Sequence, residues 1–200
     1  MLFYCSFFIF NNLLNMYQQI LNLAEKGKKL IILLFFASFF ITSACILKDY
    51  GLNWDEEAQW KANGDIVFNY IFNEDGKKLL LESNEKYHGP AFELVLIFVE
   101  KVMQLKDTRD VYLMRHAVTF LTFFIAVIFF YLLCKRCFKN WKLALLGCVF
   151  LVLSPRIFAD AFYNSKDAVF LSLFIIGMHA LLVFHENQTY KNAILYALIC

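Results

Sequence analysis

The chain has 200 residues, of which 60% are hydrophobic and 24 are Phe. A soluble domain of this length cannot bury so much apolar surface in one core, because globular proteins are nearer half apolar. The net charge of +2 hides a segregation: residues 48–110 hold eight basic and thirteen acidic side chains. No basic stripe with interleaved aromatic residues is present, which argues against nucleic-acid binding.

Uncharged apolar runs predict membrane-spanning helices at residues 30–47, 111–134, 143–154 and 168–184. The third run is short, and it reaches spanning length only if Trp141 on one side and Ile157–Ala159 on the other are counted as part of it. A fifth run covers residues 192–200 and ends with the chain, so we expect a truncated chain or a fragment. We therefore expect an all-α fold, a polytopic transmembrane helix bundle.

Basic residues of short loops predict the orientation of these spans. Lysines at 26, 28 and 29 precede the first span, and four basic residues lie in the loop 135–142 between the second and third. Because such clusters stay in the cytoplasm, we expect segments 1–29, 135–142 and 185–191 to be cytoplasmic and loops 48–110 and 155–167 to be outside. The protein is then an integral, multi-pass membrane protein with a cytoplasmic N-terminus, in the inner membrane of a bacterium or the ER of a eukaryote.

Three segments outside the spans have the pattern of amphipathic helices. Apolar residues recur at a spacing of three to four over 55–72, and Pro90 opens a second such stretch, 90–105. Both are expected to lie as interfacial helices along the outer membrane surface. The N-terminal part of segment 1–29 has the same spacing, and an interfacial helix is expected there on the cytoplasmic side.

The outer loop opens with acidic residues. Asp55 and Glu56 follow the first span by about two turns, between Trp54 and Trp60. A partly shielded carboxylate at that depth serves as a general base on a hydroxyl or as a ligand for a divalent cation. The alternative is that these residues only begin a helix with favourable charge.

Other polar residues cluster near the same predicted membrane face. Arg115 lies at the outer end of the second span, where a guanidinium is costly unless it faces water, an anion or a partner, or snorkels to the interface. Further candidates are His88 in the first outer loop and, in the second, Arg156 and Lys166 as phosphate-binding cations and Asp160 and Asp167 as metal ligands.

The order of these features resembles the GT-C glycosyltransferases, and most closely glycosyltransferase family 39, the protein mannosyltransferases and aminoarabinose transferases. The Asp-Glu pair typical of the first outer loop is matched by Asp55-Glu56, and an Arg entering the second span by Arg115. Tyr87–Phe92 resembles the His-Pro-Pro-Leu stretch of the mannosyltransferases, with Gly89 in place of the first Pro.

The resemblance implies an inverting membrane glycosyltransferase that uses a polyprenyl-phosphate sugar donor on the outer face. The acceptor would be a protein, a lipid or a glycan. Asp55 and Glu56 would be catalytic, while His88, Arg115, Arg156 and Lys166 would bind the donor phosphate. Asp160 and Asp167 would hold a divalent cation, Mg²⁺ or Mn²⁺. The alternatives are a non-catalytic membrane assembly subunit, a truncated inactive fragment, and a lipid or sugar transporter.

Overall fold

The computed structural model describes residues 25–72, 82 and 89–199. Every regular element within these ranges is helical, which confirms the all-α prediction. The chain forms two compact units, Met1–Cys45 and Ile46–Cys200. The predicted N-terminal amphipathic helix falls largely on residues 1–24, outside the described residues.

Three of the described helices are long and apolar enough to cross a membrane: Glu25–Asp49, α6 (Thr108–Phe138) and α9 (Asp167–Glu186). They contain the runs 30–47, 111–134 and 168–184. A bent pair of shorter helices, α7 (Trp141–Leu153) and α8 (Pro155–Tyr163), is the fourth candidate.

The bend between α7 and α8 corrects the expectation for this part of the chain. The two helices meet at an angle of 69°, so Ile157–Ala159 follow the third run only after a bend, and most of the predicted loop 155–167 is helical. Ser154 has an extended backbone (ψ 111°), and Pro155 is the first residue of α8. A proline disfavours the helical conformation in the residue before it and lacks the N–H of a helix interior, so one helix ends and another begins here.

The acidic segment 48–110 is also helical within the two predicted stretches, 55–72 and 90–105. A continuous run is formed by α2 (Glu56–Ala58), the π-helical segment η2 (Gln59–Asp65) and α3 (Ile66–Phe72), and α5 (Ala91–Met103) follows. The buried residues of α5 include Glu93 together with Leu96 and Ile97, whereas Phe98 and Val102 are exposed. The inward face of α5 is thus partly ionic, and its outward face partly apolar.

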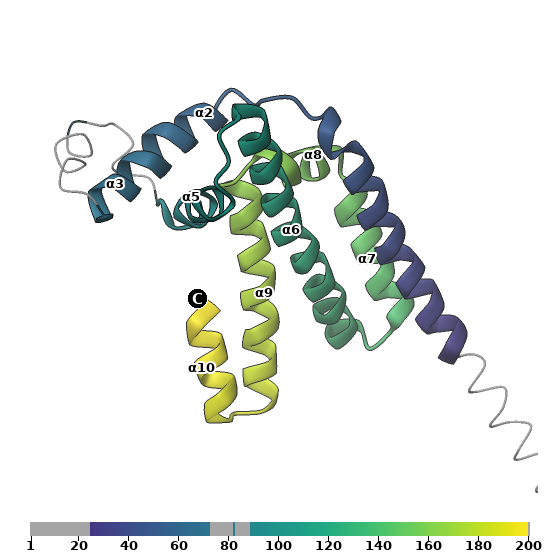
Figure 1. The fold of residues 1–200 in the computed structure, drawn as a ribbon. Helices are drawn as coiled ribbons and strands as arrows, with labels where there is room; N and C mark the ends of the chain where they lie inside the picture. The colour runs from purple at the N-terminus through teal and green to yellow at the C-terminus, as the bar shows by residue number, and fades with distance from the viewer. Residues whose placement is uncertain (1–24, 73–81, 83–88, 200) are drawn as a thin grey trace, which may run out of the picture. The chain divides into compact units, whose positions relative to one another are not determined.

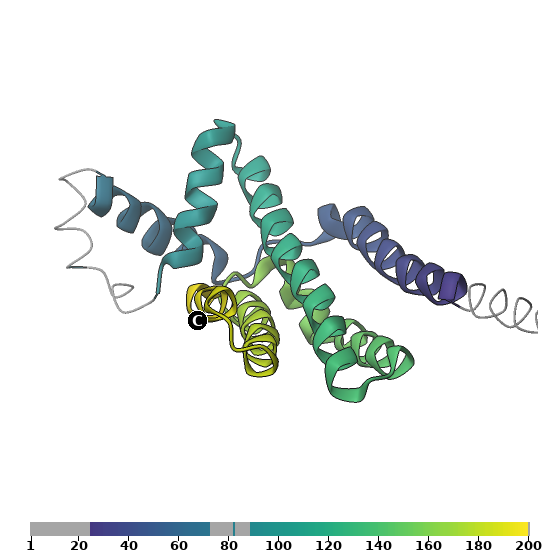
Figure 2. The same cartoon turned by 90° about the horizontal axis from the view of Figure 1, so that it is seen from below.

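Helix α6 is the centre of the second unit and contacts α7, α8 and α9, while α10 (Tyr190–Ile199) packs against α9. Figures 1 and 2 show α6 and α9 running side by side. The middle of α6 buries Phe123, Ala126 and Val127 completely. At the C-terminal ends of α6 and α9, Arg136 forms an ion pair with Glu186. The start of α6 therefore lies at the opposite end of the unit, where α2 and α8 are found (Figure 1).

Candidate functional site

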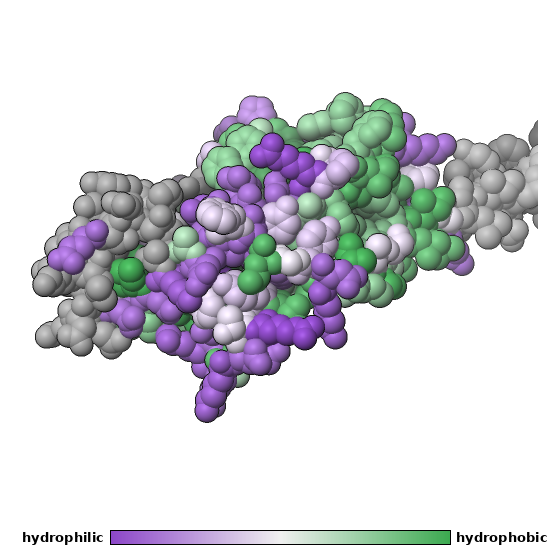
Figure 3. Space-filling view, turned by 90° about the horizontal axis from the view of Figure 1, so that it is seen from above, coloured by the Kyte–Doolittle hydropathy of each residue, from purple (hydrophilic) through white to green (hydrophobic). Residues whose placement is uncertain are grey.

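Polar side chains are buried where α2, η2 and α5 meet the start of α6 and the turn between α8 and α9. We call this group the polar cluster; each of its members is at most 6% exposed, and they are Glu56, Gln59, Glu93, Arg115, His116 and Ser165. Figure 3 views this end of the unit, and hydrophilic side chains gather over it. Buried ionisable groups need partners, and the cluster supplies them in two sets.

The first set joins Glu56 to His116. Glu56 Oε1 lies 2.7 Å from His116 Nε2, and Glu56 Oε2 accepts a hydrogen bond from the Asn53 backbone N–H at 2.8 Å. A carboxylate at Nε2 fixes the proton on that nitrogen and orients the ring. The other ring nitrogen, Nδ1, is left to accept a hydrogen bond or, where it carries a proton, to donate one.

The second set is centred on Glu93. Arg115 Nη2 donates to Glu93 Oε2 in a buried ion pair, and Ser165 Oγ lies 2.5 Å from both Glu93 Oε1 and Gln59 Oε1. A hydroxyl has one proton, so Ser165 Oγ donates to one of these two oxygens at a time. This set connects α5, α6, η2 and the residue pair before α9.

Two atoms of the cluster lack hydrogen-bond partners within the described part of the chain: Arg115 Nη1 and His116 Nδ1. A buried polar atom without a partner costs about 1–3 kcal/mol, and native structures rarely retain one without a reason. These two atoms are therefore the places at which the polar cluster has unused capacity to bind a ligand.

A cavity of about 330 Å³ opens beside His116. It is lined by Lys48 at the 3₁₀ helix η1 (Leu47–Asp49), by the following loop and by the first turns of α6. The lining residues are Lys48, Tyr50, Gly51, Leu52, Thr108, Arg109, Tyr112, Leu113 and His116. We call this the basic cavity, because its charged members Lys48 and Arg109 are cations.

A carboxylate pair lies near the polar cluster, on η2 and α5. Burial raises the pKa of Asp65, and burial together with the charge of Asp65 raises the pKa of Glu100. Glu100 accepts a hydrogen bond from Trp60 Nε1 at 3.0 Å, and the Trp60 ring meets that of Tyr112 edge to face. Both carboxylates thus hold protons more tightly than exposed acids do.

The adjacent residues Asp55 and Glu56, predicted to act as a pair, have different environments. Asp55 is exposed and precedes α2, where its side chain makes no capping hydrogen bond. Glu56 is 3% exposed and bound to His116. Of the two, only Asp55 is open to solvent, while Glu56 contacts the His116 imidazole.

The cations predicted to bind phosphate also have different environments. Arg115 is buried against Glu93, whereas Arg156 is 91% exposed with its Nε 3.7 Å from Asp160 Oδ2. Lys166 is half-buried beside Ser165. His88 lies outside the described residues. Arg115 and Arg156 therefore lie in different environments, one buried and one open to solvent.

The predicted metal ligands Asp160 and Asp167 line a common cavity of about 230 Å³, together with Arg156. The Asp167 carboxylate also accepts a hydrogen bond from the Asn164 side chain at 3.1 Å. Within the described ranges, no group of three or more His, Cys, Asp or Glu side chains is placed to hold a metal ion. Two carboxylates alone resemble a Mg²⁺ site completed by water and substrate phosphate.

Sequence reasoning missed Gln59, Glu93, His116 and Ser165 in the cluster and Lys48 and Arg109 at the cavity. Two features of the sequence could have identified Glu93 and His116. Glu93 is an acid within the apolar stretch of α5, and His116 adjoins Arg115 at the head of an otherwise uncharged run. Ionisable residues in apolar helices face partners or functional sites, but which acid meets which base depends on the fold.

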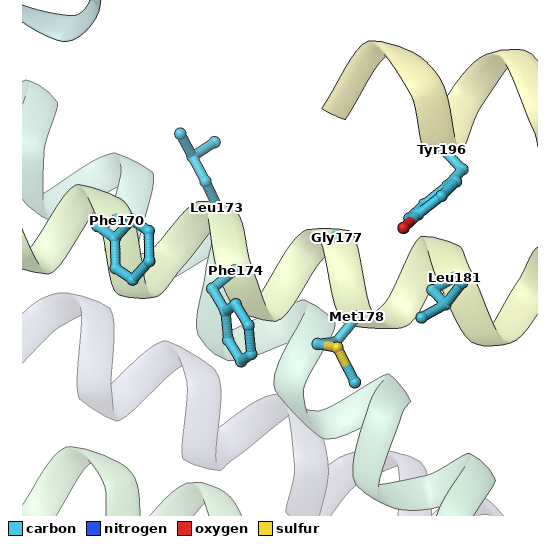
Figure 4. Close-up of a pocket in the computed structure, with 7 residues that line it drawn as sticks. All are labelled: Phe170, Leu173, Phe174, Gly177, Met178, Leu181 and Tyr196. Atoms are coloured by element: carbon cyan, nitrogen blue, oxygen red, sulfur yellow. The ribbon is translucent and has the colours of Figure 1, made fainter. Parts of the chain in front are cut away.

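A cavity of about 370 Å³ lies between α9 and α10, away from these charges. Figure 4 shows its lining, which is apolar apart from the hydroxyl of Tyr196: Phe170, Leu173, Phe174, Gly177, Met178 and Leu181. Such a surface suits a hydrocarbon chain and offers no group for proton transfer or phosphate binding.

No protein-family model, curated protein or solved structure matches this chain.

Proposed function

We propose that this chain is a multi-pass membrane glycosyltransferase of the GT-C type, similar to glycosyltransferase family 39. It moves a sugar from a polyprenyl-phosphate donor to an acceptor on the outer face of the membrane, with inversion at the anomeric carbon. The helices Glu25–Asp49, α6 and α9 support residence in a bilayer, because they are long and apolar enough to cross one.

The observation that carries the proposal is the position of the polar cluster and the basic cavity. Both lie at the head of the apolar helix α6, and they combine carboxylates, cations and an imidazole. A donor of this kind keeps its phosphate at the headgroup plane and its tail among the helices. Chemistry on it therefore needs ionic groups at one end of apolar helices, which is where this chain has them.

The transfer divides among three kinds of group. The exposed Asp55 accepts the proton of the attacking hydroxyl, as a general base. Glu56 holds His116 in position at the cavity. Cations stabilise the negative charge that grows on the departing polyprenyl phosphate. If a divalent ion takes part, Asp160 and Asp167 would hold it.

The test is sugar transfer by purified protein in proteoliposomes, from a radiolabelled polyprenyl-phosphate sugar to acceptors in native membranes. Asp55→Asn should lower the rate about 10²–10⁴-fold, the usual cost of losing a catalytic base. Glu57→Gln is the matched control, since Glu57 is an exposed neighbouring acid paired with Lys61. Equal rates for wild type and Asp55→Asn would refute the role of Asp55, and uptake of sugar without transfer would favour a transporter.

A further inference from the structure

The basic cavity has features of a binding site that the proposed chemistry does not yet use. Its volume of about 330 Å³ falls within the range of roughly 300–1,000 Å³ typical of ligand pockets. Arg109, Tyr112, Leu113 and His116 line it from one face of α6, at the spacing of successive helical turns.

One of the residues that line this cavity has an unsatisfied polar atom. His116 is 1% exposed, its Nε2 is bound to Glu56, and its Nδ1 has no partner among the described residues. An imidazole with a proton on Nδ1 has a hydrogen bond to donate there. The cavity thus combines a buried donor with two cations.

We propose that the basic cavity binds a phosphate group, held by Lys48, Arg109 and the Nδ1–H of His116. The inference rests on the proposed function in one respect, since it identifies this phosphate with that of the lipid-linked donor. It also moves the phosphate from Arg115, whose guanidinium is paired with Glu93, to residues that line an open space.

The charge and composition of the lining favour an anion. Lys48 and Arg109 are its charged residues, and none of the described residues that line it is an acid. The planar fork of Arg and the point charge of Lys both suit phosphate oxygens. Thr108, Tyr50 and Tyr112, which carry hydroxyl groups, also line the cavity.

The place of the two cations in the chain favours phosphate over other anions. Lys48 lies at the end of the apolar helix Glu25–Asp49, and Arg109 is in the first turn of α6. Basic residues at the ends of spanning helices meet the phosphates of lipid headgroups. A phosphate in this cavity would therefore remain attached to a lipid whose tail follows the apolar helices.

Binding is measured on the full chain in neutral detergent, with citronellyl phosphate as the lipid probe and inorganic phosphate as the free one. Native mass spectrometry gives the affinity for the first and competition gives it for the second. Arg109→Gln and Lys48→Gln should each weaken binding of citronellyl phosphate roughly tenfold, as expected for one charge-assisted hydrogen bond. Lys135→Gln, an exposed cation at the other end of α6, is the matched control.

The role of His116 is tested by His116→Gln and by ¹⁵N NMR of the imidazole. Citronellyl phosphate should shift the Nδ1 resonance of wild type toward the protonated value, and His116→Gln should lose about tenfold in affinity. Thermal unfolding of each variant shows whether it is folded. Because Arg109 and Lys48 are not in the polar cluster, their variants keep the test decisive even where His116→Gln unfolds.

The outcomes distinguish the source of the phosphate and the two proposals. Competition by inorganic phosphate at similar concentrations supports a site for free phosphate, and its absence supports a site for lipid phosphate. Affinities unchanged in Lys48→Gln and Arg109→Gln would overturn the phosphate site. Normal sugar transfer by these variants would also overturn the phosphate site, but it would leave the glycosyltransferase proposal intact. Binding of citronellyl phosphate by wild type without sugar transfer would instead overturn the glycosyltransferase proposal and leave the phosphate site.

Discussion

Glu56 on α2 and His116 on α6 are separated by 60 residues in the sequence, yet Glu56 Oε1 lies 2.7 Å from His116 Nε2. The pair is inaccessible to solvent, with side chains 4% and 2% exposed. It links the start of the acidic segment to the head of the apolar helix α6. The same contact stabilises the fold and orients a ring at the basic cavity.

Removal of the Glu56 carboxylate should destabilise the chain. Glu56→Ala leaves His116 Nε2 and the Asn53 N–H without their acceptor, which costs roughly 1–3 kcal/mol for a buried donor. Asp55→Ala changes the adjacent but exposed acid, and it should alter stability by less than about 0.5 kcal/mol. Thermal unfolding in detergent compares the two; equal losses would mean that Glu56 is not buried in this contact.

The ion pair between Glu93 and Arg115 should show strong coupling in a double-mutant cycle. Glu93→Leu or Arg115→Met alone strands a buried charge and should cost roughly 3–5 kcal/mol, whereas the double variant should be more stable than either. The exposed pair Arg136–Glu186 is the control, with side chains 36% and 47% exposed. Its coupling should stay below about 1 kcal/mol, and the same coupling at both sites would contradict the burial of Arg115.

Asp65 and Glu100 should make stability depend on pH in an unusual direction. Their pKa values are raised above the ordinary 3.8 and 4.5, so the folded chain binds more protons than the unfolded chain in the window above those values. Stability from these groups is then greatest at low pH and falls as the pH rises through their raised pKa values. Asp65→Asn should remove part of this fall.

This dependence is measured as the unfolding temperature between pH 4 and pH 7 for wild type, Asp65→Asn and Glu100→Gln. Asp49→Asn, an exposed acid on η1, is the control and should follow the wild-type curve. Parallel curves for Asp65→Asn and wild type would show that Asp65 is not desolvated.

The close approach of η2 to α5 predicts a steric effect at Gly64. A Cβ there would lie 2.9 Å from Ile97 Cγ1, and Ile97 is fully buried. Gly64→Ala should therefore destabilise the chain by roughly 1–3 kcal/mol. Adding Ile97→Ala removes the obstructing atoms, so the double variant should lose less than the two single losses combined.

Gly51→Ala is the control for this prediction, because nothing lies within 4 Å of a Cβ added at Gly51. An equal effect of the two glycine substitutions on unfolding temperature would show that backbone entropy, and not the contact with Ile97, determines the result.

The sequence by itself determined the helical class and the apolar helices. Uncharged runs such as 117–134 have one stable form in an apolar environment, because a helix satisfies its backbone hydrogen bonds internally. The helix at Glu56–Phe72 and the one at Ala91–Met103 also follow from local periodicity. These properties depend on residues within one or two turns, which is what a sequence pattern records.

Tertiary structure alone decided which polar residues meet. The pairing of Glu56 with His116 and of Glu93 with Arg115 spans 60 and 22 positions, and no local pattern specifies such partners. It also decided that Asp55 is exposed while its neighbour is buried, and that Lys48 and Arg109 share a cavity. Burial and charge pairing arise from the packing of helices that are distant in the sequence. The sequence therefore shows that segment 48–110 is acidic, but only the fold shows which residues its acidic side chains contact.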